Sequence, residues 1–317
     1  MTNSSSLEGR LLFAVPKSKS SARLPLPTKG RLQQATLDLL AGCDVQFRRE
    51  TRLDIALVKN LPIALIFLPA DDIPTFVGEG RVDLGITGRD QVAEHDVQAP
   101  ASATSGVEEI LDLGFGRCKL QVQTPVKGQF DEARQLIGRN VVTSFTGLAE
   151  AYFAKLEGVA EARNPRDTKI KYVGGSVEAA CALGVADGIV DLVESGETMK
   201  AAGLRATDTI LESTAVLVKS RNTQNPLVDL ITSRIRGVIT AQKFVLCQYN
   251  IPRDELATAC SITPGKRSPT VTALEGGGWV AVSSMVEKKD VANVMDELTK
   301  VGATDILVLN IANSRTD

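Results

Sequence analysis

One segment of the sequence places an acid, two hydroxyl residues and a glycine where a strand meets a helix. An apolar strand ends near Asp191, and Ser195-Gly196-Glu197-Thr198 begins a helix that runs to Ala202. Such a turn offers consecutive backbone N–H groups, two hydroxyls and the positive end of a helix to an anion. A carboxylate just before it suits ribose hydroxyls or a phosphate-bound Mg²⁺. The segment predicts a sugar-phosphate site, although a plain helix cap at Ser195 has the same pattern.

Two further segments carry weaker signals. In Arg81–Asp90, the glycines Gly85 and Gly88 flank a strand end, which is typical of a tight strand-to-helix connection. In Thr28–Leu32, two cations precede the first helix and oppose its dipole. An anionic ligand would relieve that conflict, and a solvated basic turn explains the sequence equally well.

Histidine and cysteine usage excludes several chemistries. The chain has 1 His and 5 Cys, so any metal site that needs two imidazoles is excluded. No Gly-x-Ser-x-Gly motif accompanies His95, which lies in a charged stretch and is expected to be a solvated surface residue. The cysteines are odd in number and scattered, which indicates reduced thiols in a cytosolic protein.

Composition limits the class of protein further. The 317 residues carry 36 Lys+Arg and 38 Asp+Glu, a net charge of −2, which predicts neither nucleic-acid nor anionic-membrane binding. No apolar run approaches the roughly 20 residues of a spanning helix. The polar start, Met1–Arg10, has no apolar core of a signal peptide, so we expect a cytoplasmic protein.

Hydrophobic periodicity predicts alternating strands and helices up to residue 193, and therefore parallel sheets covered by helices. Boundaries are expected in Gln98–Gly106 and in Ser220–Pro226, both polar connections. A long amphipathic helix from Leu227 to about Ala241 follows. After it the pattern is β-α-β-β-α-β over residues 244–311, which is typical of a ferredoxin-like module.

The sequence resembles the long form of the ATP phosphoribosyltransferases. The strongest match is Glu178-x₅-Gly184-x-Ala186-x₂-Ile189-x-Asp191-Leu192-x₂-Ser195-Gly196-x-Thr198-Met199. Further matches follow the family's order along the chain: Lys29–Leu32, Asp71–Pro74, Asp83–Gly88, Leu113–Leu120, Gly175–Glu178, Ser268–Val271 and Gly302–Leu309.

The resemblance implies an α/β fold with a two-lobed, periplasmic-binding-protein-like catalytic core and a C-terminal ferredoxin-like (βαββαβ) regulatory domain. Lobe I is expected to comprise residues 1–114 and 198–222, and lobe II residues 115–197 with the phosphoribosyl-binding loop. Residues 223–317 are expected to form the regulatory, histidine-binding domain.

The resemblance also implies a reaction and its residues. ATP and phosphoribosyl pyrophosphate give N1-(5-phosphoribosyl)-ATP and pyrophosphate, the first step of L-histidine biosynthesis, with Mg²⁺ held by the substrate phosphates and no dedicated metal site. The catalytic residues are expected to be Lys29, Arg31 and Asp191. The phosphoribosyl group is expected on Ser176, Glu178, Asp191, Glu194, Ser195, Gly196, Glu197 and Thr198. ATP is expected on Lys29, Gly30, Arg31, Asp72, Gly88 and Asp90.

Regulation and assembly are implied in the same way. Gln248, Ser268 and Thr270 are expected to bind inhibitory L-histidine, and the chain is expected to form dimers and hexamers. Gln248 and Asn250 are neutral where some relatives carry acids.

Two alternatives stay open. An insertion, Ser18–Thr28, leaves either Lys17 or Lys29 as the active-site lysine. A non-catalytic two-lobed protein that binds or senses a small ligand is the alternative function, because fold alone does not establish chemistry.

Overall fold

The computed structural model describes residues 10–16, 32–48, 54–102, 105–158 and 168–315. Lys17, the Ser18–Thr28 insertion and Lys29–Arg31 lie outside these residues. The chain divides into two compact units, Met1–Asp38 with Val45–Val228, and Leu39–Asp44 with Asp229–Asp317. Within the described residues, no helix has the length and apolar character needed to cross a membrane.

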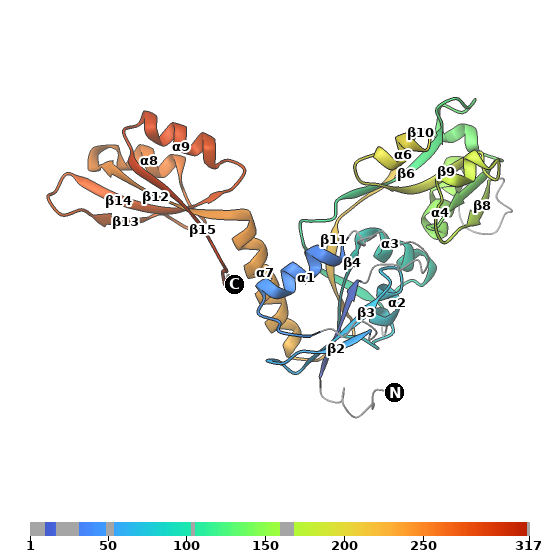
Figure 1. Cartoon of the computed structure of the whole chain (residues 1–317), viewed down its shortest axis with the longest axis horizontal. Coiled ribbons are helices and arrows are strands. Elements are labelled where there is room, and N and C mark those ends of the chain that lie inside the picture. Colours follow the sequence, from blue (N-terminus) through green and yellow to red (C-terminus); the bar gives the residue numbers. More distant parts are fainter. Residues whose placement is uncertain (1–9, 17–31, 49–53, 103–104, 159–167, 316–317) are drawn as a thin grey trace. The chain divides into compact units, whose positions relative to one another are not determined.

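The first unit contains two sheets, which define two lobes (Figure 1). Lobe I has the strand order β2-β3-β1-β4-β11-β5. Its strands are β1 (Leu11–Pro16), β2 (Ile55–Leu57), β3 (Ile63–Leu68), β4 (Leu84–Gly88), β5 (Val107–Asp112) and β11 (Ala215–Ser220). The helices in this part of the sequence are α1 (Gln33–Gly42), α2 (Ile73–Gly78) and α3 (Arg89–Gln98).

Lobe II has the strand order β10-β6-β9-β7-β8. Its strands are β6 (Cys118–Pro125), β7 (Asn140–Thr143), β8 (Lys169–Tyr172), β9 (Gly188–Val193) and β10 (Leu204–Ser213). Its helices are the 3₁₀ turn η2 (Ala133–Leu136), α4 (Thr146–Glu157), α5 (Ala179–Ala182) and α6 (Glu197–Ala201). Leu120, Val141 and Phe153 belong to one of its apolar cores.

Both sheets are mixed, so the prediction of parallel sheets is wrong in part. β1 pairs in parallel with β3 and β4, but β11 is antiparallel to both β4 and β5. In lobe II, β7 pairs in parallel with β8 and β9, whereas β6 is antiparallel to β9 and β10. The antiparallel strands β5 and β10 are absent from the predicted pattern because both are polar and half-exposed. β11 is absent as well, although it is apolar and buried.

The expected limits of the lobes also change. The resemblance predicts residues 198–222 in lobe I, but α6 packs on β10, and β10 pairs with β6 in the second sheet. Only from β11 onwards does the chain return to the first sheet. The chain thus passes from lobe I to lobe II after β5 and returns after β10 (Figure 1).

The motif Asp83–Gly88 is used to assemble lobe I. Asp83 accepts hydrogen bonds from the Leu12 backbone N–H (2.8 Å) and from Thr223 Oγ1 (2.6 Å), and so ties β1 to the chain after β11. Every residue of β4 is buried. A Cβ at Gly85 would lie 2.6 Å from Ile73 Cγ2 and 3.1 Å from Val77 Cγ2, so the glycine allows α2 to lie directly on the sheet.

The second unit contains the predicted β-α-β-β-α-β module after the long helix α7 (Leu227–Lys243). Its sheet order, β13-β14-β12-β15, is ferredoxin-like, and every pair is antiparallel. The elements are β12 (Phe244–Pro252), η3 (Arg253–Glu255), α8 (Leu256–Ile262), β13 (Thr270–Ala273), β14 (Trp279–Glu287), α9 (Val291–Lys300) and β15 (Thr304–Asn310). Alternate residues of β12 are buried in its core, as period-2 patterning requires.

This unit begins at Asp229 rather than at residue 223, and it also includes Leu39–Asp44. Arg234 Nη1 donates to the Cys43 carbonyl (3.1 Å), and Asn313 Nδ2 donates to the Gly42 carbonyl (2.9 Å). These bonds to the end of α1 explain why a segment distant in sequence belongs to the C-terminal unit. The expected fold class, a two-lobed α/β core followed by a ferredoxin-like domain, is confirmed.

Gly85→Ala should lower the free energy of unfolding by about 1–3 kcal/mol, because an added methyl overpacks the contact between α2 and β4. Gly175→Ala is the matched control, since nothing lies within 4 Å of a Cβ at that position. Urea unfolding of both variants measures the difference. Equal stability of the two variants would contradict the close approach of α2.

Candidate active site

A cavity of about 480 Å³ lies between the two lobes of the first unit. Lobe I supplies two residues at the start of α2 and the polar face of α3: Asp71, Thr75, Gln91, Glu94, His95 and Gln98. Lobe II supplies residues from the ends of β7, β8 and β9: Ser144, Thr146, Tyr172, Gly174, Gly175, Ser176, Val177, Glu178 and Asp191. Carboxyl ends of parallel strands are the usual position of ligands in α/β sheets.

Three of the predicted phosphoribosyl residues, Ser176, Glu178 and Asp191, lie together in this cavity. Burial and, to a smaller extent, the nearby charge of Glu178 raise the pKa of Asp191 to about 6, against the opposing effect of a hydrogen bond from the Leu192 N–H. That N–H lies 2.8 Å from Asp191 Oδ1. A half-buried carboxyl with a raised pKa beside another carboxyl in a cleft marks a candidate functional site.

Backbone strain occurs at the same place. Ser176 has φ +51°, which a residue with a Cβ adopts only at a cost of ~1–3 kcal/mol. The strained turn lies between β8 and α5 and presents Ser176 to the cavity. Such strain is common where a side chain or carbonyl must be held for a ligand.

The predicted loop after β9 forms a smaller cavity of about 260 Å³, lined by residues 192–196, 198 and 199. Gly196 has φ +79° and is the residue that precedes α6. Glu197 N–H donates to Ser195 Oγ over 3.4 Å, which shapes the turn. Glu194, Ser195, Gly196 and Thr198 line this cavity, whereas Glu197 is exposed and pairs with Lys200 at 3.6 Å.

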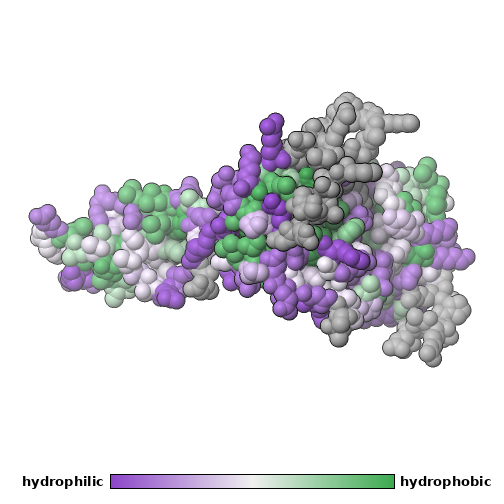
Figure 2. All heavy atoms as spheres, turned by 90° about the horizontal axis from the view of Figure 1, so that it is seen from below, coloured by the Kyte–Doolittle hydropathy of each residue, from purple (hydrophilic) through white to green (hydrophobic). Residues whose placement is uncertain are grey.

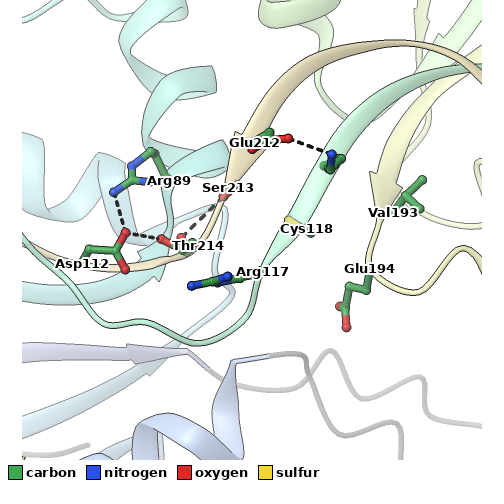
Figure 3. A pocket seen from close by; sticks show the side chains of 10 residues that line it. Arg89, Asp112, Arg117, Cys118, Val193, Glu194, Glu212, Ser213 and Thr214 are labelled. Atoms are coloured by element: carbon green, nitrogen blue, oxygen red, sulfur yellow. Dashed lines mark hydrogen bonds and ion pairs between the residues drawn. The ribbon is translucent and has the colours of Figure 1, made fainter. Parts of the chain in front are cut away.

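A third cavity, of about 470 Å³, lies where the chain crosses between the lobes (Figure 3). On one wall Asp112 accepts bonds from Arg89 Nη2 (3.1 Å) and Thr214 Oγ1 (2.9 Å). On another, Lys119 and Glu212 form an ion pair at 2.7 Å. Glu194 lines this cavity as well as the loop cavity, so the two adjoin at the end of β9.

The lobe I residues predicted to bind ATP differ in their exposure to solvent. Asp72 is exposed at the start of α2, beside the cavity residue Asp71, and Gly88 is the buried end of β4. Asp90 is fully buried: its carboxylate accepts from Ser213 Oγ (2.5 Å), and its N–H donates to that oxygen (2.9 Å). In this structure Asp90 therefore fastens α3 to the end of β10. Lys29, Gly30 and Arg31 lie outside the described residues.

Sequence analysis missed several cavity residues. Gln91, Glu94 and Gln98 recur at helical spacing on α3, a signal that is visible in the sequence but that any solvated helix face also shows. The prediction that His95 is a solvated surface residue is wrong. Its side chain is 14% exposed and borders the cavity.

The residues predicted to bind histidine lie on the second unit's sheet. Gln248 and Thr270 both pair with Ser283 of β14, from opposite sides, and Gln248 Nε2 donates to Ser283 Oγ at 2.9 Å. Ser268 is exposed just before β13. Asn250 donates to Asp305 Oδ2 at 3.0 Å, so an acid from β15 lies beside the neutral Asn250.

A metal site requires several side chains that can coordinate the ion together. Among the described residues, no group of three or more His, Cys, Asp or Glu side chains could hold a metal ion. Asp71, Glu178 and Asp191 nevertheless line one cavity, and carboxylate oxygens are ligands that suit Mg²⁺.

The fold and site define a class: a two-lobed α/β core with an acidic interlobe cavity and a loop of small residues that lines a second cavity, followed by a ferredoxin-like domain. A family model described as HisG, ATP phosphoribosyltransferase, matches residues 69–237, and one for the HisG C-terminal domain matches residues 241–313. The chain belongs to the ATP phosphoribosyltransferase family and is a transferase.

Named relatives support this family assignment, and a solved structure has a similar fold. The chain is 59% identical over 310 residues to an ATP phosphoribosyltransferase of Yarrowia lipolytica and 52% identical over 311 residues to that of Saccharomyces cerevisiae, covering 98% of each chain in both comparisons. The fold is similar to that in an ATP phosphoribosyl transferase (HisG:HisZ) complex from Thermotoga maritima. That likeness has a TM-score of 0.54 and 23% identity, and covers 71% of this chain and 98% of that one.

Asp191→Asn should stabilise the ligand-free protein at pH 7.5 by about 1–3 kcal/mol and leave its stability at pH 4 unchanged. Since folding raises the pKa of Asp191 from 3.8 to about 6, the folded state holds the proton more strongly. Stability is therefore lost as the pH rises through that interval, and the amide avoids the loss. Denaturant unfolding at both pH values measures the difference, and a variant that is less stable at pH 7.5 would contradict it.

Proposed function

We propose that the protein transfers the 5-phosphoribosyl group of phosphoribosyl pyrophosphate to N1 of ATP. The products are N1-(5-phosphoribosyl)-ATP and pyrophosphate, in the first step of L-histidine biosynthesis. The observation that carries the proposal is the cluster of Ser176, Glu178 and Asp191 in the interlobe cavity of a chain from this family.

Lobe II holds the phosphoribosyl group in this proposal. Glu178 and Asp191 accept hydrogen bonds from the ribose hydroxyls, and Ser176 lies beside them. The 5′-phosphate binds to the amides and hydroxyls of the loop Glu194–Thr198, where Gly196 leaves room for close approach. The loop cavity formed by residues 192–199 supports this placement.

Lobe I holds ATP and the leaving pyrophosphate. Lys29, Gly30, Arg31, Asp72 and Gly88 are the proposed contacts, and the cavity adds Asp71. Because Asp90 is buried against Ser213, we assign it to the positioning of α3 and of the neighbouring Gly88.

The chemistry requires no covalent enzyme intermediate. Adenine N1 forms a bond to C1 of the ribose as the bond from C1 to the pyrophosphate oxygen breaks, and C1 gains positive charge in the transition state. Ionised Asp191 stabilises that charge, while Lys29 and Arg31 neutralise the pyrophosphate. Mg²⁺ bound to the substrate phosphates would supply further neutralisation of the leaving group. The alignment of one substrate on each lobe accelerates the reaction further, because it brings the reacting atoms together in the correct orientation.

The alternative, a non-catalytic two-lobed binding or sensing protein, is not favoured. Near-complete coverage of relatives named as transferases argues against it. An acid held at a raised pKa inside the cavity also exceeds what passive binding of a phosphate requires.

Regulation by L-histidine is proposed for the second unit, at Gln248, Ser268 and Thr270. Asp305 provides a carboxylate beside Asn250 for the amino group of the inhibitor. Homodimers and hexamers are proposed as well. Apolar side chains exposed on the outer strands support self-association, and Figure 2 shows hydrophobic surface on this unit at the left. These side chains are Val271, Leu307, Val308 and Leu309.

Residence in the cytoplasm is proposed from the five free cysteines, a state maintained in reducing compartments. Neither nucleic acid nor membrane is proposed as a partner, because the net charge is −2.

Pyrophosphate release from the purified protein should require ATP, phosphoribosyl pyrophosphate and Mg²⁺ together, and L-histidine should suppress it. A coupled pyrophosphate assay measures both effects. Release that is insensitive to histidine removes the proposed inhibitor site and keeps the enzyme. No release from folded protein that still binds nucleotide favours the alternative function.

Lys29→Ala and Arg31→Ala should each lower kcat/KM by about tenfold or more, since each removes a cation from the leaving group. Lys17→Ala is the comparison variant, because Lys17 is the alternative active-site lysine. Steady-state kinetics with varied phosphoribosyl pyrophosphate show whether Lys17 or Lys29 is the active-site lysine. The assignment to Lys29 and Arg31 fails if both variants stay within about twofold of wild type.

A further inference from the structure

A carboxylate of lobe I caps a helix of lobe II. Glu94 lies on α3 and is 8% exposed. Its Oε1 accepts from the Gly147 N–H (2.7 Å), and its Oε2 accepts from the Leu148 N–H (2.8 Å). Both N–H groups are in the first turn of α4, where a helix has no internal acceptors for them. Phe145, the residue before α4, makes no side-chain cap.

The contact around this carboxylate is close and specific. Gln98 Nε2 donates to Glu94 Oε1 at 2.6 Å and to Thr146 Oγ1 at 3.4 Å. A Cβ at Gly147 would lie 3.2 Å from atoms of both Glu94 and Gln98. The glycine therefore permits α3 and α4 to approach, and two side chains of α3 hold the start of α4.

The same residues border the interlobe cavity. Glu94 and Gln98 line it from lobe I, and Thr146 lines it from lobe II, with Glu178 and Asp191 farther along lobe II. The chain also connects the lobes through the crossings after β5 and β10, and Asp90 of α3 bonds to Ser213 at the end of β10. Asp90 holds the start of α3 beside the crossing, whereas Glu94 and Gln98 hold its later turns against α4, so the angle between the lobes depends in part on the contact of α3 with α4.

We propose that Glu94 is a positioning residue that joins the lobes and sets the alignment of the two substrates. The catalytic part of this inference rests on the proposed function. All proposed phosphoribosyl contacts belong to lobe II, whereas the proposed ATP contacts belong to lobe I. Loosening the joint should therefore spare binding of phosphoribosyl pyrophosphate but impair the step that needs both lobes, since misplacement of about 1 Å can cost about a hundredfold in rate.

The test compares Glu94→Gln with Asp96→Asn. Glu94→Gln keeps the size but turns an amide group toward one of the two N–H donors. It should lower kcat by about tenfold or more, with the Kd for phosphoribosyl pyrophosphate within about twofold of wild type. Asp96 lies on the same helix and contacts His95 at 3.5 Å, so Asp96→Asn should change neither quantity. Gly147→Ala, which wedges the helices apart, should act like Glu94→Gln.

A second measurement does not depend on turnover. Nitroxide labels at the exposed Glu79 of lobe I and Lys171 of lobe II report the interlobe distance, in a background with Cys181 and Cys260 replaced by serine. Glu94→Gln should broaden or shift the distance distribution, and Asp96→Asn should not. If the wild-type protein shows no turnover but the distances change as expected in Glu94→Gln, the proposed function is contradicted and the role of Glu94 in joining the lobes is not. Two results would overturn the proposal. One is that both Glu94→Gln and Gly147→Ala leave the interlobe distances and kcat unchanged. The other is that kcat and the affinity for phosphoribosyl pyrophosphate fall equally.

Discussion

The two-lobed arrangement of the first unit depends on two segments in which the chain crosses between the sheets, one after β5 and one after β10. Strand pairing within each sheet is extensive, but no described strand pairs across the lobes. The region of the crossings is organised by Asp112, which accepts from Arg89 and Thr214 and from the Gly114 N–H. Each lobe can therefore be rigid while the cavity between them is defined by a few polar contacts, which is an arrangement suited to admitting substrates and then aligning them.

Lobe II places two acids, Glu178 and Asp191, in the cavity. Burial disfavours the ionised form of Asp191 and raises its pKa, and the charge of Glu178 acts in the same direction. Such a pair is unfavourable in the empty protein and favourable once positive charge or ribose hydroxyls are beside it. The site thus exchanges some stability for function, as binding and catalytic sites commonly do.

Sequence analysis was most successful where the signal is local. The C-terminal module and the buried strand β3 follow from apolar periodicity. The loop Glu194–Thr198 is recognised from adjacent residues and lines a cavity, and its binding of a phosphate stays a prediction. β10 was missed because it is polar and half-exposed. Glu94 was missed for a different reason: its partners are 53 and 54 residues away. In the sequence it resembles any solvated helix carboxylate, and only the packing of α3 on α4 gives it a role.

The position of β11 has a consequence for the order of folding. β11 lies between β4 and β5 in the first sheet, yet it is synthesised after the whole of lobe II. While the ribosome is still making residues 113–214, β5 has no neighbouring strand and one edge of β4 is open. Lobe II, whose strands are consecutive from β6 to β10, can be completed first. The lobe that begins the chain is thus the later of the two to close, and its exposed strand edges need protection from aggregation in the interval.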